Sequence, residues 1–146
     1  MRKLSIGCGE NWKEEHPDYE GIDVNDYGQK YVGDALQQAI SLNGKYYGII
    51  IANHILEHFD FEYIRMLMNE LYDLLEDDGE LRIIVPHKSK GKAWVPCHST
   101  HWCEETFKFF ARKNVALYGY KRWKIKEVTV NYRNDIYCVM KRYEKD

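Results

Sequence analysis

The sequence has little of what marks an irregular or cross-linked chain. It contains only three prolines, ten glycines and four cysteines in 146 residues, and 45% of its residues are hydrophobic. These amounts exclude a collagen-like repeat, a disordered polymer and a disulfide-stapled miniprotein. The cysteines lie in separated regions with no scaffold-like spacing, so we expect free thiols in a reducing compartment: Cys8, Cys97, Cys103 and Cys138.

Long apolar runs and an excess of one charge are missing as well. No run approaches the roughly 18 apolar residues that span a bilayer, and the first apolar stretch is too short for a signal peptide. We therefore expect a cytoplasmic protein without a membrane partner. Lys and Arg total 21 against 23 Asp and Glu, a net charge of −2. Because dedicated nucleic-acid-binding proteins are usually strongly basic, this balance indicates no dedicated nucleic-acid binding.

What is present is an alternation of short apolar runs with longer amphipathic ones. The sequence shows no linker, low-complexity tract or internal repeat, so a single domain over residues 1–146 is expected. Strands are predicted at residues 3–6, 19–24, 30–32, 47–52 and 81–85, and helices at 36–42, 60–76 and 104–113. Two further strands, 123–132 and 135–142, form a predicted hairpin. This order predicts an α/β sheet with an antiparallel edge.

The ends of the first four predicted strands carry residues suited to a nucleoside. In such a sheet, ligands bind beyond the carboxyl ends of the strands. The first strand ends at Gly7-Cys8-Gly9, where the backbone can approach a ligand closely. The second ends at Asp23, whose carboxylate can accept both hydroxyls of a ribose, and the third is followed by Asp34, an acceptor for an exocyclic amine. The fourth ends at Asn53-His54. Together these ends predict a nucleoside-binding site.

These segments resemble the class I S-adenosylmethionine-dependent methyltransferases of the type 11 kind. The similarity rests on LSIGCGENW, GIDV, VGDAL, ANHILEHF, LLEDDGELRIIVP and the segment from PCH to HWCEETFKFF, and covers about residues 3–113. It implies a Rossmann-like, mostly parallel seven-stranded sheet with a C-terminal antiparallel hairpin. It also implies S-adenosylmethionine as cofactor and methyl transfer to a small-molecule, saccharide-like or peptide-like acceptor. The cofactor-binding residues implied are Ser5, Gly7, Cys8, Gly9, Asp23, Val24, Asp34, Ala35, Asn53 and His54.

Three features depart from that family. An acidic residue is frequent where Ser5 stands. Only residues 10–22 separate Gly9 from Asp23, so we expect the first crossover helix to be shortened or absent. The first strand begins at residue 3, without the helices that often precede it and roof the pocket. We therefore expect an open pocket, or one that a second copy of the chain or another partner completes.

The segment between the fifth strand and the next helix holds the candidate catalytic groups. A neutral imidazole can take a proton from the acceptor near pH 7, so His98 or His101 is the predicted general base. Alignment of the acceptor alone can also supply much of the rate.

The same segment raises the question of zinc, because His87, Cys97, His98, His101 and Cys103 lie within it. The spacing lacks Cys-x-x-Cys pairs, and the adjacent Cys97 and His98 are not expected to converge on one ion, so we predict no metal site. Two alternatives to an enzyme stay open. One is a non-catalytic module that binds S-adenosylmethionine within an assembly, and the other is a zinc-stabilised interaction domain built around residues 97–103.

Overall fold

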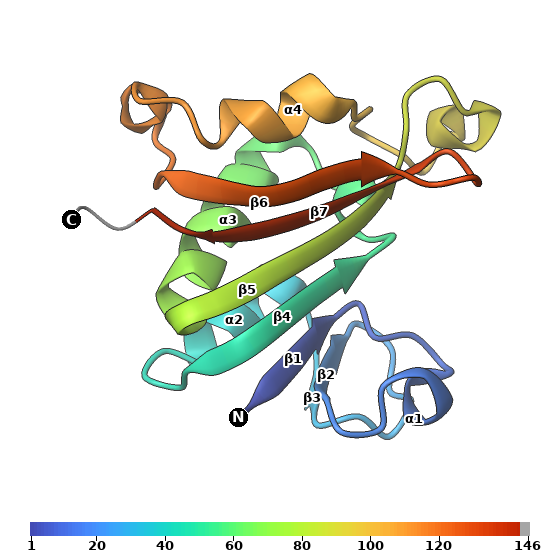
Figure 1. The fold of residues 1–146 in the computed structure, drawn as a ribbon. Coiled ribbons are helices and arrows are strands. Elements are labelled where there is room, and N and C mark those ends of the chain that lie inside the picture. The colour runs from blue at the N-terminus through green and yellow to red at the C-terminus, as the bar shows by residue number, and fades with distance from the viewer. Residues whose placement is uncertain (144–146) are drawn as a thin grey trace.

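A computed structural model describes residues 1–143. Over these residues, seven strands form one sheet in the order β3-β2-β1-β4-β5-β7-β6 (Figure 1). The first five strands in that order are parallel, and β7 is antiparallel to both β5 and β6. The predicted fold, a Rossmann-like mostly parallel sheet with a C-terminal antiparallel hairpin, is confirmed. The strands are β1 (Lys3–Ile6), β2 (Glu20–Asp23), β3 (Tyr31–Val32), β4 (Tyr47–Asn53), β5 (Leu75–Pro86), β6 (Trp123–Val130) and β7 (Asp135–Arg142).

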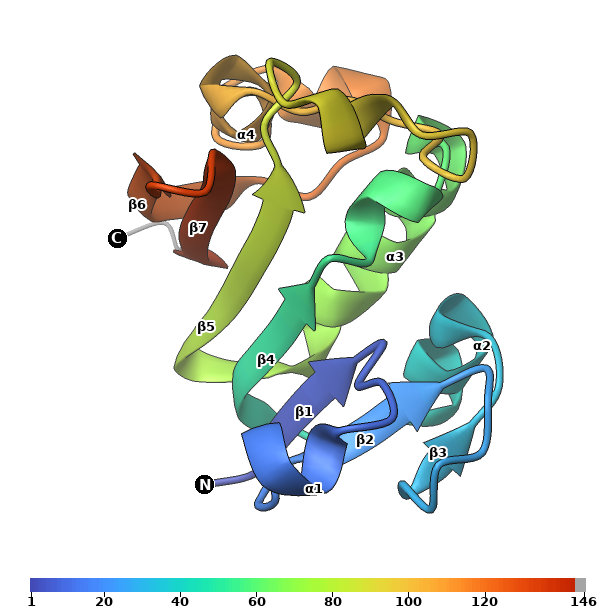
Figure 2. The same cartoon turned by 90° about the vertical axis from the view of Figure 1, so that its right-hand side faces the viewer.

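The helices are short and lie mainly on one face of the sheet. Figure 1 shows α2 and α3 together behind the sheet, and Figure 2 shows both on one side of it, whereas α1 lies apart from them near β1 and β2. The crossover from β1 to β2 contains one four-residue helix, which confirms that the first crossover helix is shortened. None of the described helices is long and apolar enough to cross a membrane. The helices are α1 (Trp12–Glu15), α2 (Ala35–Ser41), α3 (Phe61–Leu74) and α4 (Glu104–Phe109), with 3₁₀ turns η1 (Leu56–His58), η2 (Gly91–Trp94) and η3 (Val115–Tyr118).

The hydrophobic core lies between the sheet and these helices. Helix α3 buries an apolar stripe that repeats every three or four residues, as its sequence predicts: Ile64, Leu67, Met68, Leu71 and Leu74. Each such side chain contributes about 1.5–3 kcal/mol when fully buried. The stripe packs with alternate residues of the central strands, which are fully buried: Leu4, Ile6, Ile50, Leu81, Ile83 and Val85.

The opposite face of the sheet is more polar. Arg82 on β5 lies between Ile51 of β4 and Val139 of β7, and its side chain stays 36% exposed. It pairs with Glu80, which also accepts a bond from Lys126 of β6. A sheet with one face in the core and the other toward solvent shows this alternation of apolar and polar residues.

Two element boundaries differ from the predicted ones by more than two residues. Strand β5 begins at Leu75, directly after α3, because Leu75 already pairs with Tyr47 of β4. Residues 76–79 then bulge out of the pairing between β4 and β5, which resumes where Glu80 lies opposite Ile49. Asp78 lies in this excursion with a φ of 62°. Helix α4 ends at Phe109, earlier than predicted, because the following amides bond carbonyls three residues back in tight turns.

A carboxylate at the start of β2 ties four segments together. Glu20 accepts hydrogen bonds from the hydroxyls of Tyr31 and Tyr47 and from the guanidinium of Arg2, and pairs with Lys30. Burial alone would raise the pKa of Glu20, but the bonds from Arg2, Tyr31 and Tyr47 outweigh it and lower this pKa to about 2.

We expect Glu20→Gln to lower the free energy of unfolding by about 2–3 kcal/mol at pH 7, since the ionised carboxylate is the form that these donors stabilise. The folded-state pKa lies below the ordinary value of 4.5, so this stability is present above pH 4.5 and is lost as the pH falls toward 2. Urea unfolding at pH 7, 4 and 3 measures the difference. The exposed Glu14→Gln is the control, and equal effects of the two substitutions would contradict the prediction.

Candidate functional site

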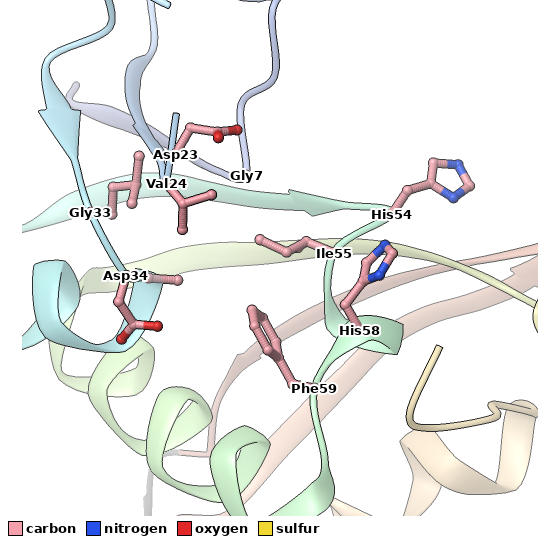
Figure 3. Close-up of a pocket in the computed structure, with 11 residues that line it drawn as sticks. Gly7, Asp23, Val24, Gly33, Asp34, His54, Ile55, His58 and Phe59 are labelled. Atoms are coloured by element: carbon pink, nitrogen blue, oxygen red, sulfur yellow. The ribbon is translucent and has the colours of Figure 1, made fainter. Parts of the chain in front are cut away.

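An open pocket of about 280 Å³ lies at the carboxyl ends of β1, β2 and β4 (Figure 3). It is lined by Gly7, Ile22, Asp23, Val24, Gly33, Asp34, Ala35, His54, Ile55, His58 and Phe59. The lining thus brings together six of the residues that the sequence predicts for the cofactor: Gly7, Asp23, Val24, Asp34, Ala35 and His54. The other four lie outside the lining within the described chain: Ser5, Cys8, Gly9 and Asn53.

The glycine turn after β1 curls over the end of β2. The amides of Gly7 and Cys8 both donate to the carbonyl of Ile22, at 2.8 and 3.1 Å. Gly7 has a φ of 65°, and a Cβ added there would lie 2.5 Å from Cδ1 of Ile55. The turn therefore favours glycine at this position for its backbone conformation, and any larger residue would also force the Ile55 side chain to move.

Asp23 is held in place by the backbone on either side of it. Its Oδ2 accepts from the Gly9 amide and its Oδ1 from the Asn25 amide, each at 3.0 Å. Figure 3 shows its carboxylate directed toward the turn at Gly7. A carboxylate oxygen can accept two hydrogen bonds, so each retains a free lone pair. Gly9 thus acts through Asp23, although it does not line the pocket.

Asp34 lines the pocket but serves a structural role as well. Its Oδ2 accepts from the Gln37 amide and caps α2, while its Oδ1 accepts from the Tyr63 hydroxyl at 2.7 Å. Tyr63 in turn accepts from the Leu36 amide and stacks on Phe59 at 4.1 Å between ring centroids. Burial, followed by the bond to Asp34, raises the pKa of Tyr63, so this hydroxyl stays a donor at neutral pH.

His54 leaves β4 in a strained conformation, with a φ of 55°. Its ring nitrogens lie 3.7 Å from a carboxylate oxygen of Glu57 and 3.8 Å from one of Asp135. The Glu57 contact, with help from the charge of Asp135, raises the pKa of His54 above its ordinary value. Figure 3 shows the ring pointing away from the space between Ile55 and Phe59, so His54 lines the mouth of the pocket.

The two histidines predicted as general bases lie in different surroundings. His98 packs edge-to-face on His58, a lining residue, with ring centroids 4.7 Å apart. His101 stacks instead on Trp94, at 3.7 Å. Neither lines the pocket itself, so their catalytic roles stay predictions.

Sequence reasoning missed five of the lining residues: Ile22, Gly33, Ile55, His58 and Phe59. Three of them lie in ANHILEHF, and the signal was the apolar and aromatic character of that segment after the strand end. Cys8, predicted as a cofactor-binding residue, packs against Gly21 of β2, where burial raises the pKa of its thiol to about 11 and keeps it neutral, and its contact with a cofactor stays a prediction.

Comparisons with known proteins give matches in structure alone. No protein-family model matches the sequence, and no curated protein matches it. A SAM-dependent methyltransferase from Archaeoglobus fulgidus is similar over 97% of this chain and 86% of its own, with a TM-score of 0.69 and 21% identity. The N-methyltransferase NodS from Bradyrhizobium japonicum WM9, in complex with S-adenosyl-L-homocysteine, is similar over 98% and 78%, with a TM-score of 0.67 and 15% identity.

An O-methyltransferase family protein from Burkholderia thailandensis is similar over 99% of this chain and 52% of its own, with a TM-score of 0.65 and 12% identity. The names of two of these neighbours refer to different acceptor atoms, nitrogen and oxygen. Sequence identities of 12–21% support a shared fold and nothing further. The chain has the fold of the class I S-adenosylmethionine-dependent methyltransferases.

Proposed function

We propose that this chain binds S-adenosylmethionine in the pocket at the strand ends and transfers its methyl group to a small-molecule or saccharide-like acceptor. The observation that carries the proposal is Asp23, a carboxylate held at the end of β2 by two backbone amides, with acceptor capacity left toward the pocket. A ribose offers two adjacent hydroxyl donors, which suit such a carboxylate.

The remaining walls fit the other parts of this cofactor. Val24 is 68% exposed beside Asp23, and Ile55 and Phe59 point into the same space, so the pocket offers apolar surfaces for a purine ring. Asp34 keeps a free lone pair on each oxygen beside these surfaces for an exocyclic amine. The glycine turn provides a close backbone approach for the methionine part.

When bound, the cofactor supplies an electrophilic methyl group. The chain's own contribution is to hold the acceptor in line with that group, and such alignment alone supplies a large rate advantage. A proton released by the acceptor would pass to His98 or His101, or to water. Completion of the open pocket by a second copy or another partner, and the cytoplasmic location, stay predictions of the sequence.

Asp23→Asn tests the ribose contact. Asparagine keeps the shape of aspartate but replaces one acceptor oxygen by a donor, so either a backbone bond or a ribose bond is lost. We expect the affinity for S-adenosylhomocysteine to fall by more than about tenfold, since a hydrogen bond to a charged group is worth about 1.5–3 kcal/mol. Isothermal titration calorimetry measures the change.

Asp26→Asn is the matched control for this test. Asp26 lies in the same segment after β2, and its carboxylate accepts only from the Gly28 amide among the described bonds, away from the pocket lining. Its substitution should leave the affinity unchanged. A folded wild-type protein that binds no S-adenosylhomocysteine, or equal losses in both variants, would contradict the proposed site.

A pair of glycine substitutions tests the turn. Gly7 and Gly9 both have positive φ, but an added Cβ meets Ile55 only at Gly7 and open space at Gly9. We expect Gly7→Ala to weaken binding of S-adenosylhomocysteine more than Gly9→Ala does, because Gly7→Ala also displaces Ile55 in the pocket wall, whereas Gly9→Ala acts only through the backbone strain that both share. Calorimetry measures the loss of binding, and thermal unfolding measures the loss of stability. Equal binding by both variants would contradict this prediction.

Turnover separates the enzyme from a non-catalytic binding module. We expect formation of S-adenosylhomocysteine from S-adenosylmethionine in the presence of a panel of small hydroxyl, amine and thiol acceptors, followed by mass spectrometry. The Asp23→Asn variant should lose this formation of S-adenosylhomocysteine. Tight binding with no product from any acceptor would favour the module.

A further inference from the structure

A cluster of three metal-ligating side chains lies at the edge of the pocket. One ring nitrogen each from His58 and His98 and the Sγ of Cys97 all lie within 4.8 Å of one another. His58 belongs to η1, whereas Cys97 and His98 follow η2 some forty residues later in the chain. Cys97 and His98 were not expected to converge easily, and the structure corrects this expectation, since one ligand atom of each lies within 4.8 Å of the other and of His58.

The hydrogen bonds of the two imidazoles leave one nitrogen of each free to bind a metal. Nδ1 of His58 lies 3.1 Å from the carbonyl oxygen of Cys97, and Nδ1 of His98 lies 3.3 Å from that of Ala93. A carbonyl oxygen only accepts, so both Nδ1 atoms carry the proton and both Nε2 atoms keep a lone pair. Metal-binding histidines typically donate their other ring N–H to such a carbonyl, which fixes the ring's orientation.

The backbone around the cluster is already fixed without a metal. The amides of Ser99 and Thr100 both donate to the carbonyl of Glu57, the residue before His58, at 2.8 and 3.1 Å. The Thr100 hydroxyl accepts from the buried indole of Trp102. The loop and η1 are therefore held together next to the three ligands, so little ordering is needed when an ion binds.

The chemistry of the three ligands selects the kind of ion. A thiolate with two imidazoles is a soft set that suits zinc and does not suit magnesium or calcium. Tetrahedral zinc binds nitrogen at about 2.0–2.1 Å and thiolate sulfur at about 2.3 Å, which places ligand atoms roughly 3.3–3.6 Å apart. The present spread of up to 4.8 Å closes with side-chain movements of about an ångström.

We propose that His58, Cys97 and His98 form a three-ligand zinc site whose fourth position is open. Structural zinc sites normally have four protein ligands, whereas sites that keep an exchangeable position have three. Two of the ligands are exposed, so water or an acceptor group can reach the ion. Because His58 also lines the pocket, the ion would sit at its mouth and link η1 to the loop after η2.

The residue before His58 is a buried carboxylate, which a cation nearby would stabilise. Glu57 is only 1% exposed, and its Oε1 has no hydrogen-bond partner within the described part of the chain. Its Oε2 lies 3.7 Å from the His54 ring, so only one of the two oxygens lacks a contact, and a further positive charge close by would reduce the cost of burying this carboxylate. The proposal gives His98 the role of ligand in place of general base, and it stands whether or not the pocket binds S-adenosylmethionine.

The other histidines and cysteines of the loop have other contacts. His87 bonds Glu104 and Ser89, His101 stacks on Trp94, and the Sγ of Cys103 lies 3.7 Å from the Thr106 hydroxyl. The site is therefore different from the zinc domain considered from the sequence, which used only the loop. These residues also provide matched controls of the same types.

Zinc binding by the whole chain tests the proposal directly. Tag-free protein purified without chelator is analysed by elemental mass spectrometry, and protein stripped of metal is titrated with zinc chloride in a calorimeter. We expect one zinc per chain. Cys97→Ser and His98→Gln should each weaken binding by more than about 100-fold, since even outer-shell partners of a metal are worth about 10–100-fold.

Cys103→Ser and His101→Gln are the controls and should bind zinc as the wild type does. Titration with cobalt(II) adds a spectroscopic readout, because a cobalt–thiolate absorption band should form in the wild type and be absent in Cys97→Ser. Circular dichroism checks that each variant is folded. Wild-type protein that takes up no zinc, or control variants that lose as much affinity as the ligand variants, would overturn the proposal.

Discussion

Helices α2 and α3 cover one face of the sheet, and this packing determines which residues of each strand are buried and which face solvent. Alternate residues of β1, β4 and β5 point into a core shared with these helices, and the residues between them point to a face where Arg82 and Glu80 pair in partial contact with solvent. With a first crossover of only four helical residues, the chain reaches β2 quickly and leaves the ends of β1 and β2 accessible.

The pocket is shaped by backbone bonds before any ligand arrives. The turn at Gly7 is fixed by two amides on one carbonyl, and Asp23 is fixed by two amides on its own carboxylate. Asp34 is fixed by the start of α2 and by Tyr63 from α3. A site held in this way loses little conformational entropy on binding, which favours affinity for a ligand that matches it.

Much of this arrangement could be predicted from the sequence because it is local. The strands, the short first crossover and the residues after each strand follow from apolar patterns, glycines and turn residues a few positions apart. The contacts that could not be predicted join distant segments: Asp135 of β7 to His54, Tyr63 to Asp34, and His58 to the loop at residues 97–98. Asp34 is an example: the sequence alone is compatible with a ligand acceptor or with a helix cap, and the hydrogen bond from Tyr63 becomes known only from the structure.

The two faces of the sheet place different demands on neighbouring residues of one strand. On β5, Leu81, Ile83 and Val85 are fully buried, so a change of side-chain volume there leaves a cavity or a clash. The residues that alternate with them are only partly buried, so their side chains face fewer packing constraints: Glu80, Arg82 and Ile84. Every second position of such a strand therefore tolerates more kinds of side chain than its neighbours do. Two chains can thus share this fold while differing at most of these positions.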